Sequence, residues 1–520
     1  MRPVLWSQNV RSLDLKAKEL GLSELLLMES AAHGAAAAVR TWAGSVAGER
    51  VVGLCGRGGN GGDALGMLRW LGLWGADPVA IVLGEPEGPA GEQGQAFAAS
   101  FPDRTYTLET AESQDELELV AEVLAGADLV LDGLLGVGVQ GPARGAVRAV
   151  IERLARCPVP IVAVDLPSGL ETDTGALPGP VVSAALTLAM GALKPCHVLP
   201  PAAAACGEVQ VVPVAYPPAA WDEVEPAARV LSEEFCAACL PPRPPHGHKG
   251  TFGRVLIVGG SVSMAGAAGL AASGALRAGA GLVHVLCPEP VYGVLEGAVP
   301  EALVHPGGAA PDGTFAPDAA QLALELVREA DAVVVGPGIG RTPGASEVVR
   351  ALATAGHPQV LMDADALYSL AHERKLLGPH EGHWLLTPHP GEFSRLAGVE
   401  VEQVVGEKLS SAGRAAQQWG ATVVLKGAPT VVASSEGLLY LNLTGNTGLA
   451  HGGSGDVLAG VIGGLWAGGA DPVEAACGGV YVHGKAAERL ARVRSPRGVL
   501  PTDLLPAVPQ AIARLERRYP

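Results

Sequence analysis

The chain is 520 residues long, and at about 150 residues per domain this length predicts two to four domains. Hydrophobic residues make up 48% and charged residues 17%, a balance that excludes a disordered chain. The formal net charge of −17 excludes the basic surface that gives proteins non-specific affinity for nucleic acid. Phosphorylated metabolites remain candidate ligands, because backbone amides at helix N-termini bind anions without Lys or Arg.

Short β-branched runs alternate with Ala- and Leu-rich stretches along the chain. Nearly continuous apolar runs that end in Gly-rich turns are typical of buried parallel strands. The pattern predicts an α/β protein with two three-layer αβα domains. The strands predicted in the first half are Val51–Leu54, Val79–Leu83, Leu129–Leu131, Ile161–Val164 and Val209–Val214. Those in the second half are Val255–Val258, Leu282–Leu286, Ala332–Val335, Val360–Met362, Trp384–Leu386, Thr422–Leu425 and Thr430–Val432.

The N-terminal residues 1–18 contain no long apolar stretch, so we expect no signal peptide. The apolar run Ala184–Leu193 is too short to span a bilayer, and the Ala/Gly-rich run after Met264 is interrupted by Arg277. The eight cysteines are scattered, which fits free thiols in a reducing compartment. We therefore expect a cytoplasmic protein that binds no membrane.

A glycine-rich turn, residues 56–63 (Gly-Arg-Gly-Gly-Asn-Gly-Gly-Asp), follows the first predicted strand and precedes a helix predicted from Ala64 to Trp70. Glycines let the backbone approach a ligand, and the helix start presents free N–H groups to an anion. The alternative is a βα turn that binds nothing. Asn60 and Asp63 add polar groups to the same turn and favour a ligand site.

Two further predicted strands of the first half end in carboxylates, Asp132 and Asp165. A carboxylate that closes an apolar strand must be solvated, hydrogen-bonded or paired with a cation. Oxygen-bearing side chains at neighbouring strand ends, those of Asn60, Asp132 and Ser168, would suit a hard cation. The alternative is that Asp165 or Ser168 only caps the following turn.

The boundary between the halves lies in a Pro-rich stretch, residues 216–245. We expect domains at 1–215 and 232–520, with a linker at 216–231. Cys236 and Cys239, with His246 and His248 downstream, leave a zinc site open as an alternative. The sequence from Ser232 onward favours a helix start with both cysteines on its apolar face.

A second glycine-rich turn, Asn446–Asp456, is the most informative motif of the second half. It opens a helix predicted from Val457, and such a turn creates an anion hole for a phosphoryl group. Asp456 could take a proton from a hydroxyl there, or it could simply cap the helix. Further polar motifs follow other predicted strands: Gly336–Gly340, Asp363–Asp365, Thr387–Glu392 and Lys426–Thr430.

The first half resembles the NAD(P)H-hydrate epimerases in its glycine turn, in the segments 27–32, 132–145 and 165–169, and in Lys194-Pro195. The resemblance implies a Rossmann-like sheet, a potassium ion held by Asn60, Asp132 and Ser168, and a catalytic Asp165. Gly59 stands where this family usually has Asn, and Ala64 where it has Gly. The substrate contacts implied are Gly59, Asn60, Gly61, Gly62, Asp63, Gly136, Val137, Gly138, Val139, Gln140, Gly141, Pro142 and Asp165.

The second half resembles the ribokinase-like fold, and more narrowly the ADP- or ATP-dependent (S)-NAD(P)H-hydrate dehydratases. The resemblance spans residues 243–460 and implies a catalytic Asp456 and an ADP or ATP bound with Mg²⁺. The substrate contacts implied are Ala267, Gly338, His389, Pro390, Gly391, Glu392, Phe393, Ser394, Arg395 and Asp456. The nucleotide contacts implied are Lys426, Gly427, Ala428, Pro429, Thr430, Asn446, Thr447, Gly448, Leu449, Ala450, His451, Gly452, Gly453, Ser454 and Gly455.

Together the resemblances imply a bifunctional repair enzyme for hydrated NADH and NADPH, which we expect to be a homo-oligomer. The first domain would interconvert the R and S hydrates, and the second would dehydrate the S form with ADP or ATP. The alternative is a ribokinase-like small-molecule kinase with a non-catalytic N-terminal nucleotide-binding or scaffold domain. An ordinary Rossmann dehydrogenase is disfavoured, because the turn at Gly56–Gly61 lacks an acidic residue at the ribose-binding distance.

Overall fold

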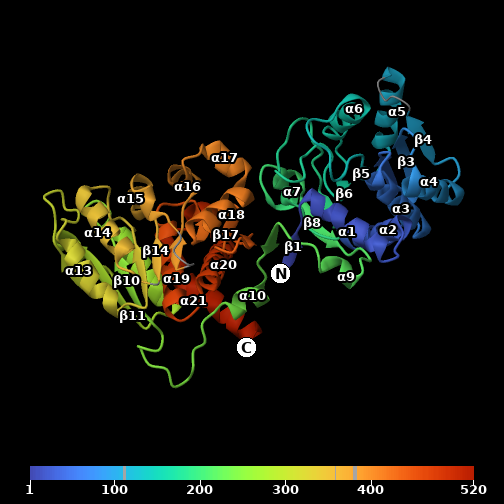
Figure 1. Cartoon of the computed structure of the whole chain (residues 1–520). Helices are drawn as coiled ribbons and strands as arrows, with labels where there is room; N and C mark the ends of the chain where they lie inside the picture. The colour runs from blue at the N-terminus through green and yellow to red at the C-terminus, as the bar shows by residue number, and fades with distance from the viewer. Residues whose placement is uncertain (109–112, 358, 379–382, 520) are drawn as a thin grey trace. The chain divides into compact units, whose positions relative to one another are not determined.

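The computed structural model describes all residues except 109–112, 358, 379–382 and 520. The chain divides into two compact units, Arg2–Ala227 and Ala228–Pro520 (Figure 1). This division falls inside the linker predicted at residues 216–231. The linker residues are themselves structured, because they contain a short helix, α9 (Pro218–Trp221), and a strand, β9 (Ala228–Val230).

The first unit is built on a seven-stranded parallel sheet with the strand order β4-β3-β2-β5-β6-β7-β8. Its strands are β2 (Arg50–Cys55), β3 (Asp77–Leu83), β4 (Thr105–Leu108), β5 (Leu129–Gly133), β6 (Ile161–Val164), β7 (Leu186–Met190) and β8 (Glu208–Val212), while β1 (Arg2–Val4) lies outside this sheet. The other helices are α1 (Ser7–Glu19), α2 (Glu24–Ala43), α3 (Gly59–Leu73), α4 (Gly88–Ser100), α5 (Gln114–Ala125), α6 (Gly145–Leu154), α7 (Pro195–Val198) and α8 (Ala202–Ala205).

The two faces of this sheet are covered by different helices, because successive side chains of a strand point to opposite sides. Along β2, Val51 packs in one core with buried residues of α2, α3 and α4. Its neighbour Val52 packs in the other core with α5 and α6. The predicted three-layer architecture of the first half is therefore confirmed.

The second unit has a mixed sheet in the order β9-β18-β17-β16-β15-β14-β13-β10-β11-β12. Strand β17 runs antiparallel to both its neighbours, and the other pairs are parallel. After β9 the strands are β10 (Arg254–Val258), β11 (Leu282–Pro288), β12 (Leu303–Gly307), β13 (Ala332–Val335), β14 (Val360–Met362), β15 (Trp384–Leu386), β16 (Thr422–Leu425), β17 (Thr430–Ala433) and β18 (Leu439–Asn442).

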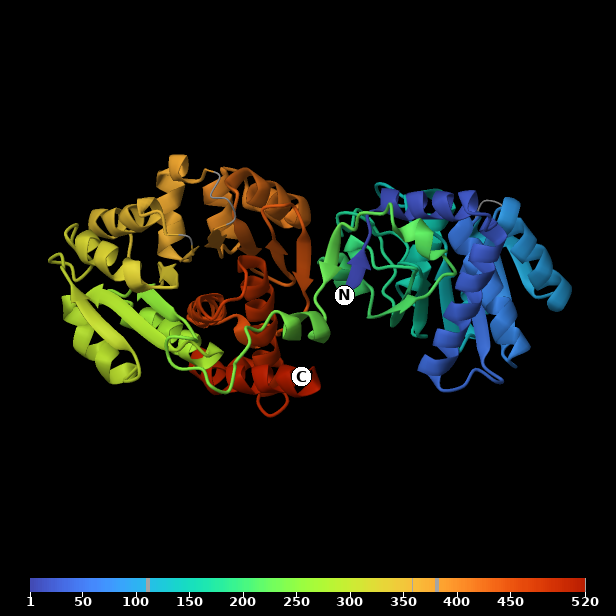
Figure 2. The same cartoon turned by 60° about the horizontal axis from the view of Figure 1, so that its bottom comes forward.

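Helices flank the second sheet as well (Figure 2). Helices α11, α19, α20 and α21 share one apolar core with strand residues, and Figure 2 shows the yellow and orange helices of residues 319–419 on the opposite side of the sheet from the red C-terminal ones. The α-helices are α10 (Glu233–Ala238), α11 (Ala265–Ala278), α12 (Tyr292–Ala298), α13 (Ala319–Leu326), α14 (Pro343–Thr354), α15 (Asp365–His372), α16 (Pro390–Ala397), α17 (Val401–Gly406), α18 (Lys408–Trp419), α19 (Ser454–Ala467), α20 (Pro472–Ala491) and α21 (Pro501–Arg518). Short 3₁₀ helices are η1 (Glu289–Val291), η2 (Val327–Glu329), η3 (Arg374–Leu376), η4 (Thr447–Leu449) and η5 (Pro496–Gly498).

Helices α11 and α19 pack unusually closely because small residues line their contact. A Cβ atom at Gly460 would lie 1.9 Å from the carbonyl oxygen of Ala271, so only glycine fits there. This contact fixes the position of α19, whose first turn carries Asp456.

Every predicted strand is present, but both helices that follow the glycine turns begin earlier than expected. Helix α3 begins at Gly59 rather than Ala64, and α19 begins at Ser454 rather than Val457. The glycines therefore form the first helical turns themselves. Helix α10 begins after Ser232, as predicted, and buries Cys236 and Cys239. None of the described helices combines the length and the apolar character needed to cross a membrane.

Candidate functional sites

A cavity of about 690 Å³ opens in the first unit beyond the carboxyl ends of its strands. It lies where the strand order reverses, with β3 on one side of β2 and β5 on the other, as is usual for ligand sites in such sheets. The loops after β2 and β5 meet there: a Cβ at Gly56 would lie 2.2 Å from the carbonyl oxygen of Leu134. The cavity is lined by the glycine turn, the segment after β5, and Asp165.

The cavity contains part of the predicted substrate set. Gly59, Asn60, Gly61, Asp63, Gly136, Val137, Val139 and Asp165 line it, whereas Gly62, Gly138, Gln140, Gly141 and Pro142 are not among the lining residues. The N–H groups of Gly59, Asn60 and Gly61 have no backbone acceptor in the described part of the chain. These free donors at the start of α3 can bind an anion.

The predicted cation ligands Asn60, Asp132 and Ser168 are joined around the backbone of Leu135. Asn60 Nδ2 donates to the Leu135 carbonyl oxygen at 2.7 Å, and the Leu135 N–H donates to Ser168 Oγ at 3.0 Å. Ser168 Oγ in turn donates to Asp132 Oδ1 at 2.6 Å, and the Ser168 N–H to Oδ2 at 2.8 Å. Three strand ends thus bring these side chains together, as the sequence predicted.

Asp132 is a fully buried carboxyl group without a cationic partner among the described residues. Burial raises its pKa to about 6, although hydrogen bonds from Ser168 and the Leu134 N–H act in the opposite direction. A buried anion of this kind is costly unless a positive charge compensates it. The donor set fits a hard monovalent cation held by Asp132, Ser168 and the amide oxygen of Asn60.

Asp165 is held in place by a basic partner that the sequence did not place in the site. Its carboxylate accepts from Lys194 Nζ and from the Met190 N–H at 2.9 Å. Its carbonyl oxygen lies 2.8 Å from His197 Nε2, while His197 Nδ1 accepts from the Lys194 N–H at 2.9 Å. Burial, with the Lys194 charge, lowers the pKa of His197 to about 4, so the ring is neutral and Nε2 carries its proton.

Further acidic groups line the same cavity. Burial raises the pKa of Asp63, and the charges of Asp165 and Asp14 raise it further. Burial also raises the pKa of Asp14, whose carboxylate accepts from the Tyr216 hydroxyl at 2.6 Å. Asp14 and Tyr216 were not predicted as site residues, since they are 202 positions apart and Tyr216 lies in the predicted linker.

In the second unit, polar side chains gather beyond the carboxyl ends of three adjacent parallel strands, β14 to β16. Asp363 accepts from Thr387 Oγ1 at 2.7 Å and from Lys426 Nζ at 2.8 Å. Lys426 Nζ also lies 3.9 Å from Glu392 Oε2. The loops after β14, β15 and β16 are therefore linked by one cluster of charges.

Asp456 does not cap its helix. The N-cap of α19 is Gly453, at a φ of 97°, and Asp456 is the third helical residue. The N–H groups of Gly455 and Asp456 have no backbone acceptor among the described residues, so they are free to bind an anion. Burial raises the pKa of Asp456 to about 7, with Asp363 the next cause and Lys426 acting against it.

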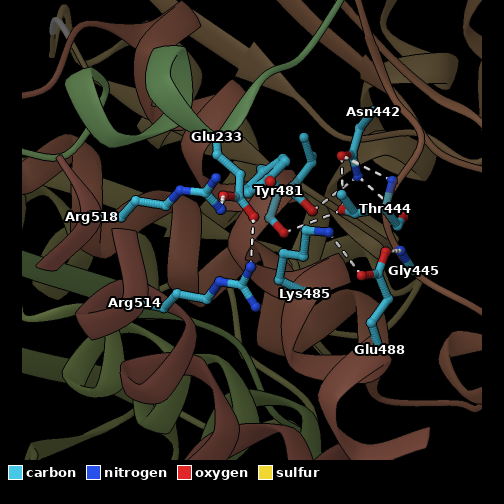
Figure 3. A network of polar contacts seen from close by, with 10 residues as sticks. Glu233, Asn442, Thr444, Gly445, Tyr481, Lys485, Glu488, Arg514 and Arg518 are labelled. Atoms are coloured by element: carbon cyan, nitrogen blue, oxygen red, sulfur yellow. Dashed lines mark hydrogen bonds and ion pairs between the residues drawn. The ribbon is translucent and has the colours of Figure 1, made fainter. Parts of the chain in front are cut away.

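Hydrogen bonds to α20 hold the loop before α19 in place (Figure 3). Thr444 Oγ1 donates to Asn442 Oδ1 at 2.8 Å and contacts the Tyr481 carbonyl oxygen at 3.2 Å. The Gly445 N–H donates to Glu488 Oε1 at 3.2 Å, and Lys485 Nζ holds the other carboxylate oxygen at 2.8 Å. These contacts fix the chain immediately before Asn446, where the predicted nucleotide segment begins.

The remaining predicted residues of this unit differ in where their side chains lie. Gly338 is against α11, since a Cβ there would lie 2.9 Å from that of Ala267. His389 caps α16, because its Nδ1 accepts from the N–H groups of Gly391 and Glu392. Phe393 is 1% exposed and packs against Trp419, so its side chain belongs to the core.

Comparison with known proteins covers both units. Residues 255–510 match the family model described as NAD(P)H-hydrate dehydratase, and residues 24–196 match the one described as YjeF-related protein N-terminus. The bifunctional NAD(P)H-hydrate repair enzyme Nnr of Moorella thermoacetica is 37% identical over 96% of this chain and 95% of its own length. The chain belongs to the family of bifunctional NAD(P)H-hydrate repair enzymes.

Solved structures of other proteins match the second unit of this repair enzyme. A ribokinase-like superfamily protein from Enterococcus faecalis V583 is 28% identical, with a TM-score of 0.50, and the match covers 56% of this chain and 98% of that one. The second unit is therefore ribokinase-like. An ADP/ATP-dependent NAD(P)H-hydrate dehydratase from Bacillus subtilis, co-crystallised with ATP and Mg²⁺, is 34% identical over 56% of this chain and 99% of that one, with a TM-score of 0.48.

The family assignment decides between the alternatives left by the sequence. A small-molecule kinase with a scaffold domain does not account for a relative that matches this chain over both units and is named as a bifunctional repair enzyme. The chain is a repair enzyme with an epimerase unit and a dehydratase unit.

Proposed function

We propose that the first unit interconverts the R and S hydrates of NADH and NADPH, and that the second dehydrates the S hydrate with ADP or ATP and Mg²⁺. The observation that carries the dehydratase assignment is the position of Asp456. Its carboxylate has no capping role and stands in the first turn of α19 beside unpaired N–H groups. A base and an anion site are thus adjacent.

In the dehydratase unit, Asp456 accepts the proton of the C6 hydroxyl while that oxygen bonds to the terminal phosphorus of the nucleotide. The bond from this phosphorus to the bridging oxygen breaks, so that AMP leaves from ADP, or ADP from ATP. The N–H groups of Gly455 and Asp456 stabilise the negative charge that develops on the phosphoryl oxygens. Phosphorylation turns a poor leaving group into a good one. Phosphate then leaves from C6, the neighbouring ring carbon loses a proton, and the reduced nicotinamide ring is restored.

The segments Lys426–Thr430 and Asn446–Gly455 hold the nucleotide in this proposal. Lys426 adds a positive charge next to Asp456, and its pKa is raised by Asp363 and Glu392 against the effect of burial. It therefore stays charged near neutral pH, where it offsets the repulsion between the phosphates and the surrounding carboxylates.

In the epimerase unit, the carboxyl groups of the cavity handle the proton of the C6 hydroxyl. Asp63, whose pKa burial raises, donates a proton as the C6–O bond breaks and water leaves. Water then adds to the other face of the ring and returns a proton, and the Asp165 carboxylate, oriented by Lys194, binds this water. A potassium ion held by Asn60, Asp132 and Ser168 would supply positive charge for the substrate phosphates.

Replacement of the proposed base tests the dehydratase assignment. Asp456→Asn should lower the turnover of pure S hydrate by about 10²–10⁴-fold, the usual cost of losing a general base, and leave ADP binding unchanged. Recovery of reduced-ring absorbance measures turnover, and calorimetric titration measures ADP binding. Near-normal turnover in Asp456→Asn would show that Asp456 only supports the helix start.

A further inference from the structure

Lys408, the first residue of α18, is a buried ammonium group that no step of the proposed reaction uses. Only 8% of the residue is exposed. Its Nζ donates to the carbonyl oxygen of Pro429 and to that of Lys426 at 3.4 Å. No carboxylate pairs with it within the part of the chain that the structure describes. The Lys408 ammonium group is therefore held by two backbone carbonyl groups.

Both carbonyls belong to the Lys426–Thr430 loop, which lies over the ammonium group. Gly427 adopts a φ of 136°, and a Cβ there would lie 2.7 Å from Lys408 Nζ. The ammonium group thus occupies the space beneath the loop that a larger residue at 427 would fill. It also fixes the backbone from which the Lys426 side chain reaches Asp363 at 2.8 Å.

A buried ammonium group without an ionic partner is expensive, because desolvation penalises the charged form. A methionine of similar length would fill the same space without that cost. The desolvation cost of the ammonium group therefore indicates that its hydrogen bonds to the loop carbonyls have a role that apolar packing would not fulfil.

We propose that Lys408 is a positioning residue that holds the Lys426–Thr430 loop in the conformation that binds the nucleotide. This inference rests on the proposed function of the second unit. Lys408 does not touch the nucleotide; it acts through the carbonyl groups of Lys426 and Pro429. The loop is ordered for binding while Nζ carries three protons, and it loses this support when the ammonium group is deprotonated.

The charge state of Lys408 is governed by its burial. Burial lowers its pKa to about 8. The strands packed against α18, β16 and β17, carry no titratable side chain, and on α17 the charged Glu402 is exposed. The nearest charged neighbours along the chain are already paired, Glu407 with Arg414 and Lys426 with Asp363. Near the loop, Glu392 and Asp456 face Lys426.

The test compares full-length wild type, Lys408→Met and Lys408→Arg, with Arg414→Met as the control. Arg414→Met removes one positive charge from the exposed face of the same helix. ADP affinity is measured by calorimetry in the presence of Mg²⁺ from about pH 7.5 to about pH 9.5. This range spans the pKa of Lys408 and stays below the pKa of ordinary lysines. KM for ADP and kcat are measured with pure S hydrate.

Loss of the charged hydrogen bonds in Lys408→Met should weaken ADP binding about tenfold at pH 7.5 and raise KM to the same extent, with kcat within about twofold of wild type. Lys408→Arg should restore most of the affinity. Wild-type affinity should fall as pH rises past about 8, and Lys408→Arg should remove this fall, since arginine stays charged. Arg414→Met should behave as wild type.

ADP affinity in Lys408→Met equal to that of wild type would overturn the inference and leave the proposed function intact. A wild type that binds neither ADP nor ATP would overturn both. If Lys408→Met does not fold, the comparison of wild type with Lys408→Arg tests the inference. The same pH dependence of ADP affinity in both proteins would contradict a role for Lys408. A fall in affinity with rising pH that occurs in wild type alone would support it.

Discussion

Asp132 and Asp456 are both buried carboxyl groups with raised pKa values, but their surroundings suit them to different tasks. Asp132 is enclosed by hydrogen-bond donors and faces no cation among the described residues. Asp456 has Lys426 and three carboxylates nearby, and the charges of Asp363, Asp365 and Glu392 oppose its ionisation. The first environment suits the cation of the proposed potassium site, and the second brings the pKa of Asp456 close to neutral pH, as its proposed role as a base requires.

The pH dependence of dehydration should report the ionisation of Asp456. Because the base must be deprotonated, kcat with S hydrate should fall about tenfold for each pH unit below about 7. Asp365→Asn removes one of the charges that raise this pKa, so the acidic limb should move to lower pH. Initial rates across about pH 5 to about pH 8 measure both profiles. A limb that stays in place in Asp365→Asn would show that another group is titrating.

The potassium site can be tested through Asp132 and through pH. Asp132→Asn should slow epimerisation and remove its dependence on potassium, while dehydration of pure S hydrate stays unchanged. The folded-state pKa of about 6 exceeds the ordinary value of 3.8, so in potassium-free buffer this group lowers stability as pH rises through that interval. Potassium should therefore raise the unfolding temperature more at about pH 7.5, above the titration of this carboxyl, than at about pH 5, below it.

The control for this experiment is a bulky organic cation at the same ionic strength. Wild-type epimerisation that runs equally fast in that buffer contradicts the metal site. Asp132 would then serve only to hold the Ser168 loop through its hydrogen bonds.

At the scale of whole elements, the start of α19 depends on the loop that α20 holds (Figure 3). Thr444→Val keeps the side-chain shape but removes the hydroxyl that contacts Asn442 and Tyr481. It should cost about 1–3 kcal/mol of stability and raise KM for the nucleotide. Chemical denaturation and initial rates measure the two effects.

Arg518→Ala is the matched control at the other end of this network. Arg518 and Arg514 both bind Glu233, and both arginines are more than half exposed. Loss of one such ion pair should cost at most about 1 kcal/mol and leave KM unchanged. If Thr444→Val also leaves KM unchanged, the loop does not position the nucleotide.

The sequence predicted most of the buried strands because each is a short apolar run, but it missed the buried strand β7 inside the apolar run Ala184–Leu193. It also missed strands without that signature. Strand β4 is mostly exposed, and the edge strand β12 contains Pro306. The helix starts were placed too late because glycine disfavours helix interiors, whereas here the glycines form first helical turns that carry free N–H groups, at Gly59 in α3 and at Gly455 in α19.

The sequence located the parts of the candidate sites that form short continuous turns, and it missed partners that come from distant positions in the chain. The turns at Gly56–Asp63 and Asn446–Asp456 are short, contiguous motifs. The partner of Asp14, Tyr216, comes from a stretch that resembles a linker in composition. The pairing of Lys194 with Asp165 likewise follows from the fold, because 29 residues separate them.

At the scale of the whole molecule, the two units provide separate sites for consecutive steps. The division between Ala227 and Ala228 keeps Tyr216 with the cavity of the first unit and β9 with its partner β18 in the second. We therefore expect fragments 1–227 and 228–520 to fold independently, as circular dichroism and thermal unfolding of each would show. Fragments that end at 215 or begin at 232 should be less stable, because they lack these contacts.

The most direct test of the two-step repair is to incubate the enzyme with a mixture of R and S hydrates, ADP and Mg²⁺. The return of the absorbance of the reduced nicotinamide ring is measured at early times. The full chain should convert the whole mixture in one continuous phase, faster than the R hydrate equilibrates by itself. Fragment 228–520 alone should convert only the S fraction rapidly, and addition of fragment 1–227 should restore the rest. If fragment 228–520 alone repairs the whole mixture as fast as the full chain, the first unit is not an epimerase and the central claim fails.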